Sequence, residues 1–307
     1  MFFAVNPWSD ELVPALLHDV AEAQSAWPSC HVVVLLDLAF DETFFSEWPW
    51  RHMRRHNVYQ AGPLAELSRV GLCMLELSDV ASNHADALHL LKGRVNHKPM
   101  FSLLISALAP DMLAQSWQPF LLARTADGLE WPVRWGDSRV VPHLVEAMTD
   151  AERTHFLAPL YAWPSVGRGG NLMRWVGGGD HTALPRDNSI WMLDEDRFNR
   201  LIELAEADAL LSRIDEVRPD LLRHQTPLAS HRGVTQCLSL ADRGGIQSAP
   251  DRLALSMIGL GLDDAFMQHP AFELLLRNTQ SGARFTQEVT ALPDEFWRAC
   301  ARHHVMA

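Results

Sequence analysis

The chain is poor in lysine and in closely spaced cysteines, and each shortage argues against a class of function. Lys92 and Lys98 are its only lysines, its net charge is −12, and it has no basic stripe, so we expect neither nucleic acid nor an anionic membrane as a partner. The four cysteines lie too far apart for a redox or zinc pair and are typical of buried thiols in a reducing compartment. With no apolar run of membrane-spanning length and no signal-peptide pattern, we expect a cytoplasmic protein.

Motifs for catalysis or cofactor binding are also missing. His52 and His56 have a metal-compatible spacing, but Arg54 and Arg55 between them would repel a cation. The glycine-rich stretches at 167–170 and 177–180 lack the Lys-Ser/Thr pair of a phosphate loop, and there is no Gly-Xaa-Ser-Xaa-Gly elbow. We therefore expect no metal, no cofactor and no catalytic residue, although 15 histidines and 38 acids leave room for a site built from scattered residues.

The pattern of hydrophobic residues predicts an α/β lobe in the first half of the chain. With 48% hydrophobic residues, the 307-residue chain can bury a sizeable core. A helix is predicted at 10–26, strands at 31–37, 72–77 and 101–106, and further helices at 41–56 and 83–95. The apolar run 119–125, an Asp127-Gly128 turn and the return run 130–135 predict a hairpin. Because a hairpin adds antiparallel strands to a sheet of strands alternating with helices, we expect a mixed sheet.

Beyond the hairpin, the sequence pattern predicts mostly helices. A helix is expected from Arg139 to Met148, and Thr149 and Glu152 form a capping-box pattern that begins another. Residues 164–189 are dense in glycine and proline, with one short strand at 171–176, and indicate a linker. We therefore expect an α/β lobe with a mixed sheet at 1–163, a linker at 164–189, and an all-α lobe at 190–307 with helix starts at Asp194 and Ser248.

A charged corner between the hairpin and the next helix is the most specific signal in the chain. Arg134, Asp137 and Arg139 lie within six positions, with Trp135 among them. Two guanidinium groups on either side of one carboxylate can form a charge-assisted cluster. The favoured interpretation is a structural clip, with partner binding and catalysis as the alternatives.

The order of these features resembles the bacterial type VI secretion effector adaptors. The resemblance covers about residues 30–165 and is carried by the strand ending in Leu36-Asp37, the segment Pro63–Leu67, the segment Ser106–Trp117, and the corner with Arg134, Trp135, Asp137, Arg139 and Val140. Gly136 stands where that family usually has an aromatic residue, and Ser138 where it usually has proline. Both departures are expected to loosen the corner.

The resemblance implies a non-catalytic adaptor or chaperone that binds an effector toxin and delivers it to a VgrG-type spike protein. We expect the helical lobe to select the cargo. The acidic segment 194–220 is either a solvated amphipathic helix or a face that steers a basic partner, with Glu203, Glu206 and Asp208 as candidates. Most of the eleven tryptophans are expected in the core, and some could anchor a partner. An immunity-type toxin inhibitor and a hydrolase without a legible motif are the rival functions.

Overall fold

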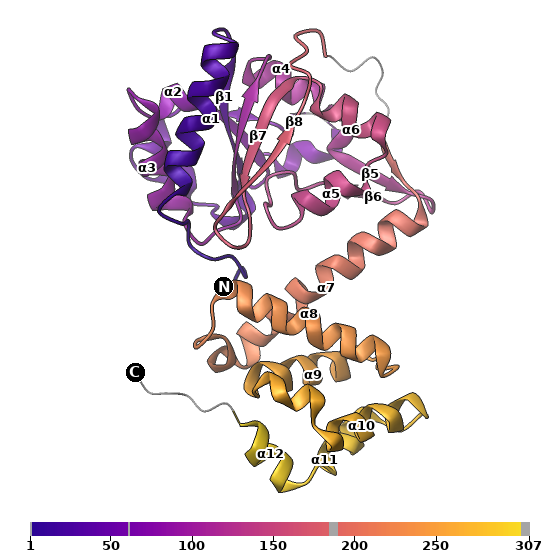
Figure 1. Ribbon diagram of the computed structural model, residues 1–307. Coiled ribbons are helices and arrows are strands. Elements are labelled where there is room, and N and C mark those ends of the chain that lie inside the picture. Colours follow the sequence, from indigo (N-terminus) through magenta and orange to yellow (C-terminus); the bar gives the residue numbers. More distant parts are fainter. Residues whose placement is uncertain (1, 61, 184–189, 302–307) are drawn as a thin grey trace. The chain divides into compact units, whose positions relative to one another are not determined.

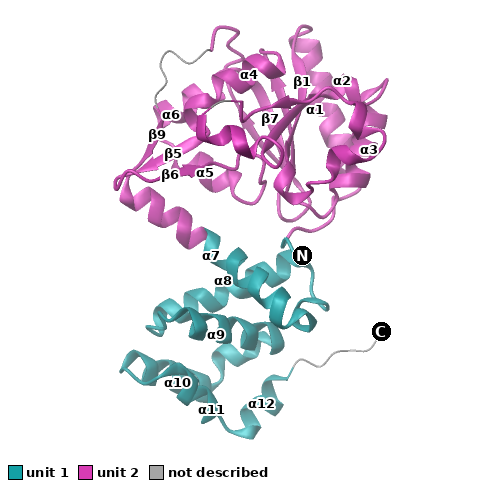
Figure 2. Ribbon diagram, turned by 180° about the vertical axis from the view of Figure 1, so that it is seen from behind, with its two compact units in different colours: residues 1–4, 205–307 teal, residues 5–204 magenta. Residues whose placement is uncertain are grey.

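The computed structural model describes residues 2–60, 62–183 and 190–301, and the chain forms two compact units. The sheet unit is Val5–Leu204, and the helical unit is Met1–Ala4 together with Ala205–Ala307 (Figure 2). The predicted fold class, an α/β N-terminal region followed by an all-α region, is confirmed.

A six-stranded sheet organises the sheet unit, with strand order β2-β3-β1-β4-β7-β8. Its strands are β1 His31–Asp37, β2 His56–Asn57, β3 Leu72–Glu76, β4 Phe101–Ser106, β7 Leu160–Val166 and β8 Leu172–Val176. Every neighbouring pair is antiparallel. Side chains alternate across a strand, so Val33 and Leu35 of β1 join one apolar cluster while Val34 and Leu36 join another. The continuous apolar run of β1 is therefore the signature of a strand buried on both faces.

Helices cover both faces of this sheet (Figure 1). One apolar cluster receives residues of α1 Leu12–Ala26, α2 Leu77–Val80 and α3 His84–Val95. The other receives residues of α4 Pro110–Ser116, α5 Val141–Ala147 and α6 Asp150–Leu157. The predicted capping box at the start of α6 is present, with the Thr149 hydroxyl accepting from the Glu152 amide and the Glu152 carboxylate accepting from the Thr149 amide.

The predicted hairpin forms, but in a separate sheet. Strands β5 Leu122–Thr125 and β6 Glu130–Pro132 are antiparallel, and Gly128 adopts the left-handed conformation that the turn requires. Strand β9 Trp191–Leu193 pairs with β5 in parallel. The mixed pairing therefore belongs to a three-stranded sheet, because β9, rather than a strand of the main sheet, takes the free edge of β5.

The helix expected at 41–56 does not form. The segment contains the short 3-10 helices η2 Phe44–Ser46 and η3 Trp50–His52, followed by β2, after η1 Leu38–Phe40. Pro49 stands in its middle, and a proline supplies no amide hydrogen to a helix and disfavours helical geometry in the residue before it. Two further 3-10 helices are η4 Gly62–Leu67 and η5 Gln118–Phe120.

The linker expected at 164–189 lies largely within the sheet unit. Its first residues complete β7, and the predicted short strand is the edge strand β8. A side chain at Gly170 would collide with the carbonyl of Pro7, and one at Gly177 with the carbonyl of Leu157. These glycines therefore permit close backbone packing, which the composition alone did not distinguish from a linker. Residues 184–189 lie outside the described residues, and the unit boundary falls between Leu204 and Ala205.

The helical unit is built almost entirely from helices, several of which begin at a side-chain cap. Its elements are the C-terminal part of α7 Glu195–Val217, then η6 Pro219–Leu222, α8 Pro227–Arg243, α9 Ala249–Gly261, η7 Asp264–Gln268, α10 Pro270–Gln280, α11 Phe285–Thr290 and α12 Asp294–Cys300. The predicted start at Ser248 is confirmed, since its hydroxyl accepts from the amide of Asp251. Thr226 caps α8 in the same way.

Candidate functional site

The first part of the corner is a buried pair between Asp137 and Arg139. One oxygen of Asp137 accepts the backbone N–H of Arg139 at 3.1 Å and its Nε–H at 3.0 Å, and the other accepts Nη2–H at 2.8 Å. The Asp137 side chain is 3% exposed. The Asp137 carbonyl accepts the amides of Val140 and Val141, so this residue also fixes where α5 begins.

Arg134 pairs with a different carboxylate, which corrects the prediction of two arginines around Asp137. Its Nε donates to Oδ2 of Asp37 at 2.9 Å, and Asp37 ends β1 with its side chain 2% exposed. The other oxygen of Asp37 accepts the amide of Ala39. A buried carboxylate without a cation would be strongly destabilising. Arg134 is therefore required as the cation of Asp37, whereas Asp137 has Arg139 as its cation.

Phe40 joins the two pairs. The guanidinium carbon of Arg134 lies 4.4 Å from the ring centroid of Phe40, and that of Arg139 lies 5.2 Å from it. Burial raises the pKa of Asp37 above its usual value although Arg134 opposes that change, and the charge of Asp137 raises it further. Sequence reasoning missed Asp37 and Phe40 as members of the corner, and the available signal was an acid at the end of an otherwise apolar strand.

The remaining corner residues fix it to the rest of the sheet unit. Trp135 is fully buried, its Nε1–H donates to the Phe120 carbonyl at 2.7 Å, and its ring centroid lies 4.2 Å from that of Phe156. A Cβ at Gly136 would lie 2.7 Å from Cβ of Asp37, so no larger side chain fits there.

The amide of Ser138 donates to the Pro99 carbonyl at 2.9 Å, a bond that proline could not make. In this chain, both departures from the adaptor pattern thus lie in close contact with neighbouring backbone or side chains.

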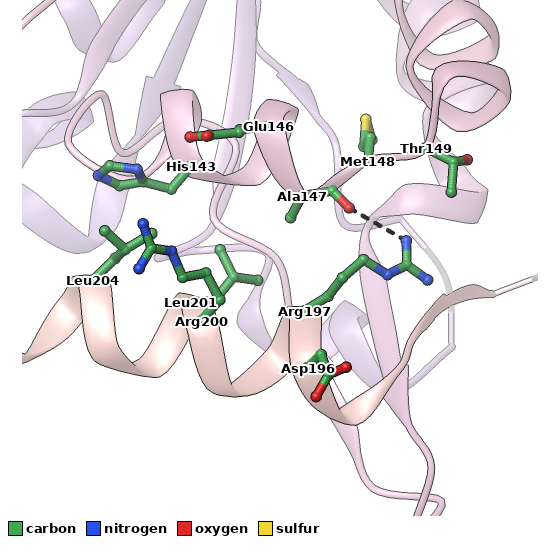
Figure 3. Close-up of a pocket in the computed structure, with 10 residues that line it drawn as sticks. All are labelled: His143, Glu146, Ala147, Met148, Thr149, Asp196, Arg197, Arg200, Leu201 and Leu204. Carbon is green, nitrogen blue, oxygen red and sulfur yellow. Dashed lines mark hydrogen bonds between the residues drawn. The ribbon is translucent and has the colours of Figure 1, made fainter.

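A groove lies directly beyond the corner, where α5 faces the beginning of α7 (Figure 3). It has a volume of about 450 Å³ and lies wholly within the sheet unit. Its lining consists of His143, Glu146, Ala147, Met148, Thr149, Asp196, Arg197, Arg200, Leu201 and Leu204. The lining therefore mixes apolar side chains with charged ones.

Arg197 is the structural centre of this groove. Its guanidinium donates to the carbonyls of Ala147 at 3.3 Å and Met192 at 2.7 Å, and to the carboxylates of Glu152 at 2.9 Å and Asp194 at 2.8 Å. One side chain thereby joins the end of α5, the capping box of α6 and the start of α7. Arg197 therefore maintains the shape of the groove.

The three acids proposed as a steering face do not share one role. Glu203 is exposed and lies 3.8 Å from Arg200, whereas Glu206 makes two bonds to Arg252 at 2.6 and 2.7 Å. Side chains advance about 100° per residue along a helix, which places Glu206 and Asp208 on nearly opposite sides of α7. Glu206 instead joins α7 to α9 in the helical unit, and this corrects its assignment to a steering face.

The remaining polar chemistry of the molecule is dispersed. Within residues 2–60, 62–183 and 190–301, no three His, Cys, Asp or Glu side chains gather in an arrangement that could hold a metal ion. Burial raises the pKa of Cys73 and that of Cys237 to about 12, so both thiols stay protonated at neutral pH. In the same described ranges, no helix combines the length and the apolar character needed to cross a bilayer.

Comparison with known proteins places the corner inside a recognised domain. No curated protein and no solved structure matches the chain. The matched region contains Asp37, Phe40 and the whole corner, and it ends within α6. Residues 34–155 match the family described as a domain of unknown function (DUF4123), and this domain is known in type VI secretion effector adaptors.

Proposed function

We propose that this protein is a cytoplasmic, non-catalytic adaptor that binds a type VI secretion effector and delivers it to a VgrG-type spike protein. The observation that carries the proposal is the match of residues 34–155 to a domain known in such adaptors. The geometry is consistent with this function, because the ion pairs of Asp37 and Asp137 fix the corner inside the matched region, and a groove lined by apolar and charged side chains lies beyond it. Binding energy alone would drive loading and release.

The proposal assigns different tasks to the two units. The matched region lies in the sheet unit, which we assign to the spike protein, and the helical unit lies outside the match. Because the matched domain is shared with other adaptors and the helical unit lies outside it, we assign the effector to the helical unit. Because cargo must also be released, moderate affinity and a partly hydrated interface are expected.

Co-purification of the tagged full chain from producing cells tests the function. An adaptor recovers both a spike protein and a large toxin. Recovery of the toxin alone would instead identify an inhibitor, and turnover of a substrate by the purified chain would identify an enzyme. The tagged Asp137→Ala chain, in which the corner of the sheet unit is expected to be destabilised, serves as the comparison for recovery by a poorly folded protein.

Exchange of the helical unit tests the division of tasks. When residues 205–307 are replaced by those of a related adaptor, the cargo should change while spike binding persists. A chimera that folds yet keeps its original cargo would place cargo selection in the sheet unit. Circular dichroism and thermal melting of the chimera establish that both units are folded.

A further inference from the structure

A basic surface bearing an exposed tryptophan interrupts this otherwise acidic protein. We define it as Trp48, Arg51, His52, Arg54 and Arg55, which lie between β1 and β2. Residues 48–56 contain three arginines and no acid, in a chain whose net charge is −12. All five side chains are exposed, and Trp48 is 76% exposed.

The exposure of Trp48 is imposed by a well-anchored backbone. Its neighbours Phe44 and Trp50 are buried, with ring centroids 4.7 Å apart. The amide of Arg51 donates to the Glu47 carbonyl at 2.9 Å, and that of Met53 to the Trp50 carbonyl at 3.1 Å. The rings of Phe44 and Trp50 therefore hold the turn in the core, while Trp48 is left in solvent.

Two of the acids that precede the basic surface in the chain are already paired with other cations. Asp41 lies 2.8 Å from Arg94 and 2.7 Å from Lys98, and Glu47 lies 2.9 Å from Arg94. None of these three carboxylate contacts involves the basic surface, so its charge is not neutralised from that side.

Within the basic surface, Arg54 approaches an acid. It lies 3.7 Å from Asp111, whose carboxylate is bonded to His56 at 2.5 Å. Arg51 donates to the ring of His52, and Arg55 lies 5.3 Å from the ring centroid of Phe45. In the part of the chain that the structure describes, neither Arg51 nor Arg55 forms an ion pair with a carboxylate.

We infer that the basic surface binds an acidic protein segment that also carries an apolar side chain. Guanidinium groups match carboxylates in geometry, and tryptophan and arginine are the side chains most enriched at the energetic centres of protein interfaces. A nucleic acid is the less favoured ligand, because three arginines offer few phosphate contacts and the net charge of −12 repels a polyanion. The inference rests on the proposed function only for the identity of the partner.

Titration with defined probes tests the surface directly. The full chain is titrated into a fluorescein-labelled eight-residue peptide that alternates glutamate and leucine, and binding is followed by fluorescence anisotropy. The Arg51→Glu/Arg55→Glu variant should bind this peptide about tenfold more weakly or worse, and Trp48→Ala should weaken binding by a similar factor. A lysine–leucine peptide should not bind.

Matched control variants separate the effect of the basic surface on peptide binding from the effect of a change in the net charge of the whole protein. Arg232→Glu/Arg284→Glu makes the same change in net charge at exposed arginines of the helical unit, and Leu274→Ala removes another exposed apolar side chain. Both controls should bind the acidic peptide like the unaltered protein. The inference is overturned if the acidic peptide does not bind, if the control variants weaken binding equally, or if a labelled eight-nucleotide single strand binds more tightly than the peptide.

Co-purification from producing cells then distinguishes this inference from the adaptor function. If the unaltered chain recovers effector and spike, the Arg51→Glu/Arg55→Glu variant should lose one of them. Full recovery of both by the variant would refute the surface and leave the adaptor function standing. Recovery of neither by the unaltered chain would refute the adaptor function, while the peptide titration would still decide the surface.

Discussion

The two units of this protein are built from different elements, one from strands and helices and the other mostly from helices. In the sheet unit, the ion pair of Asp37 with Arg134 joins residues 97 positions apart, and a hydrogen bond from Arg174 to Asp19 spans 155 positions. In the helical unit, the cap of Ser248 bonds a residue three positions away, and the ion pair of Arg252 with Glu206 spans 46 positions. Only the sheet unit contains the region that matches a known domain. The long-range pair of Asp37 with Arg134 therefore fixes the geometry of the corner inside the matched domain.

The largest expected effect is that of Asp137→Ala in the sheet unit. The substitution leaves the guanidinium of Arg139, which is 14% exposed, without its carboxylate. Removal of one partner of a buried pair costs about 3–5 kcal/mol of unfolding free energy. Ten of the eleven tryptophans lie in the sheet unit, so thermal unfolding followed by tryptophan fluorescence should show a clearly lower midpoint.

A matched pair in the helical unit provides the control. Arg218 and Asp220 are also two residues apart, but both are exposed to solvent. Asp220→Ala should therefore leave the unfolding midpoint unchanged, because exposed ion pairs contribute little. Equal effects of the two substitutions would contradict the structural role of the Asp137 pair.

Gly136→Ala should produce the next largest effect. The added methyl group would lie 2.7 Å from Cβ of Asp37 and 2.8 Å from Leu72, so β1 or the corner must shift. Such overpacking costs about 1–3 kcal/mol. Gly93→Ala is the control, because nothing lies within 4 Å of a Cβ at that helical position. Urea denaturation of both variants measures the difference, and an unaffected Gly136→Ala protein would show that the corner has room for a side chain.

Arg252→Ala tests a partly buried ion pair of the helical unit that joins α7 to α9. Its side chain, 13% exposed, bonds the carboxylates of Glu206 and Asp242. Loss of charge-assisted bonds should cost about 1.5 kcal/mol, less than the loss of Asp137. Circular dichroism at 222 nm reports this helical unit, and a larger loss than that of Asp137→Ala would reverse the contrast between the units.

The sequence predicted local features well and spatial partners poorly. The strand at β1, the capping box of Thr149 and the helix start at Ser248 depend on residues close in the chain, and all three are confirmed. The pairing of β5 with β9 depends on residues almost 70 positions apart, which no local pattern encodes. The glycine-rich composition of residues 164–189 also indicated a linker, whereas Gly170 and Gly177 permit close backbone packing.

The corner shows the same limit at the level of single residues. The motif identified Arg134, Asp137 and Arg139 as a charged group, and all three do lie in the corner. The partner of Arg134 is Asp37, which could be found only by knowing that β1 ends beside the corner. The basic surface was likewise hidden, because its arginines were weighed against metal binding and the exposure of Trp48 depends on tertiary packing.

The smallest expected effect is on the pH dependence of stability. It concerns two aspartates of the sheet unit whose pKa values are displaced in opposite directions. Burial raises the pKa of Asp37 despite Arg134. Burial would also raise the pKa of Asp41, but hydrogen bonds from Lys98 and Thr43 and the charges of Lys98 and Arg94 outweigh it, so that pKa is lowered.

The two displacements predict opposite dependences on pH. An unfolded aspartate has a pKa of about 3.9. Asp37 therefore favours the folded state fully below that value, and its contribution is lost as the pH rises through the raised pKa. The contribution of Asp41 is present above about pH 3.9 and is lost as the pH falls through the lowered pKa. Relative to the unaltered protein, Asp37→Asn should gain stability as the pH rises and Asp41→Asn should lose it. Urea denaturation between about pH 3 and 7 measures both slopes. Slopes of the same sign would show that Asp37 is not buried as its position at the end of β1 requires.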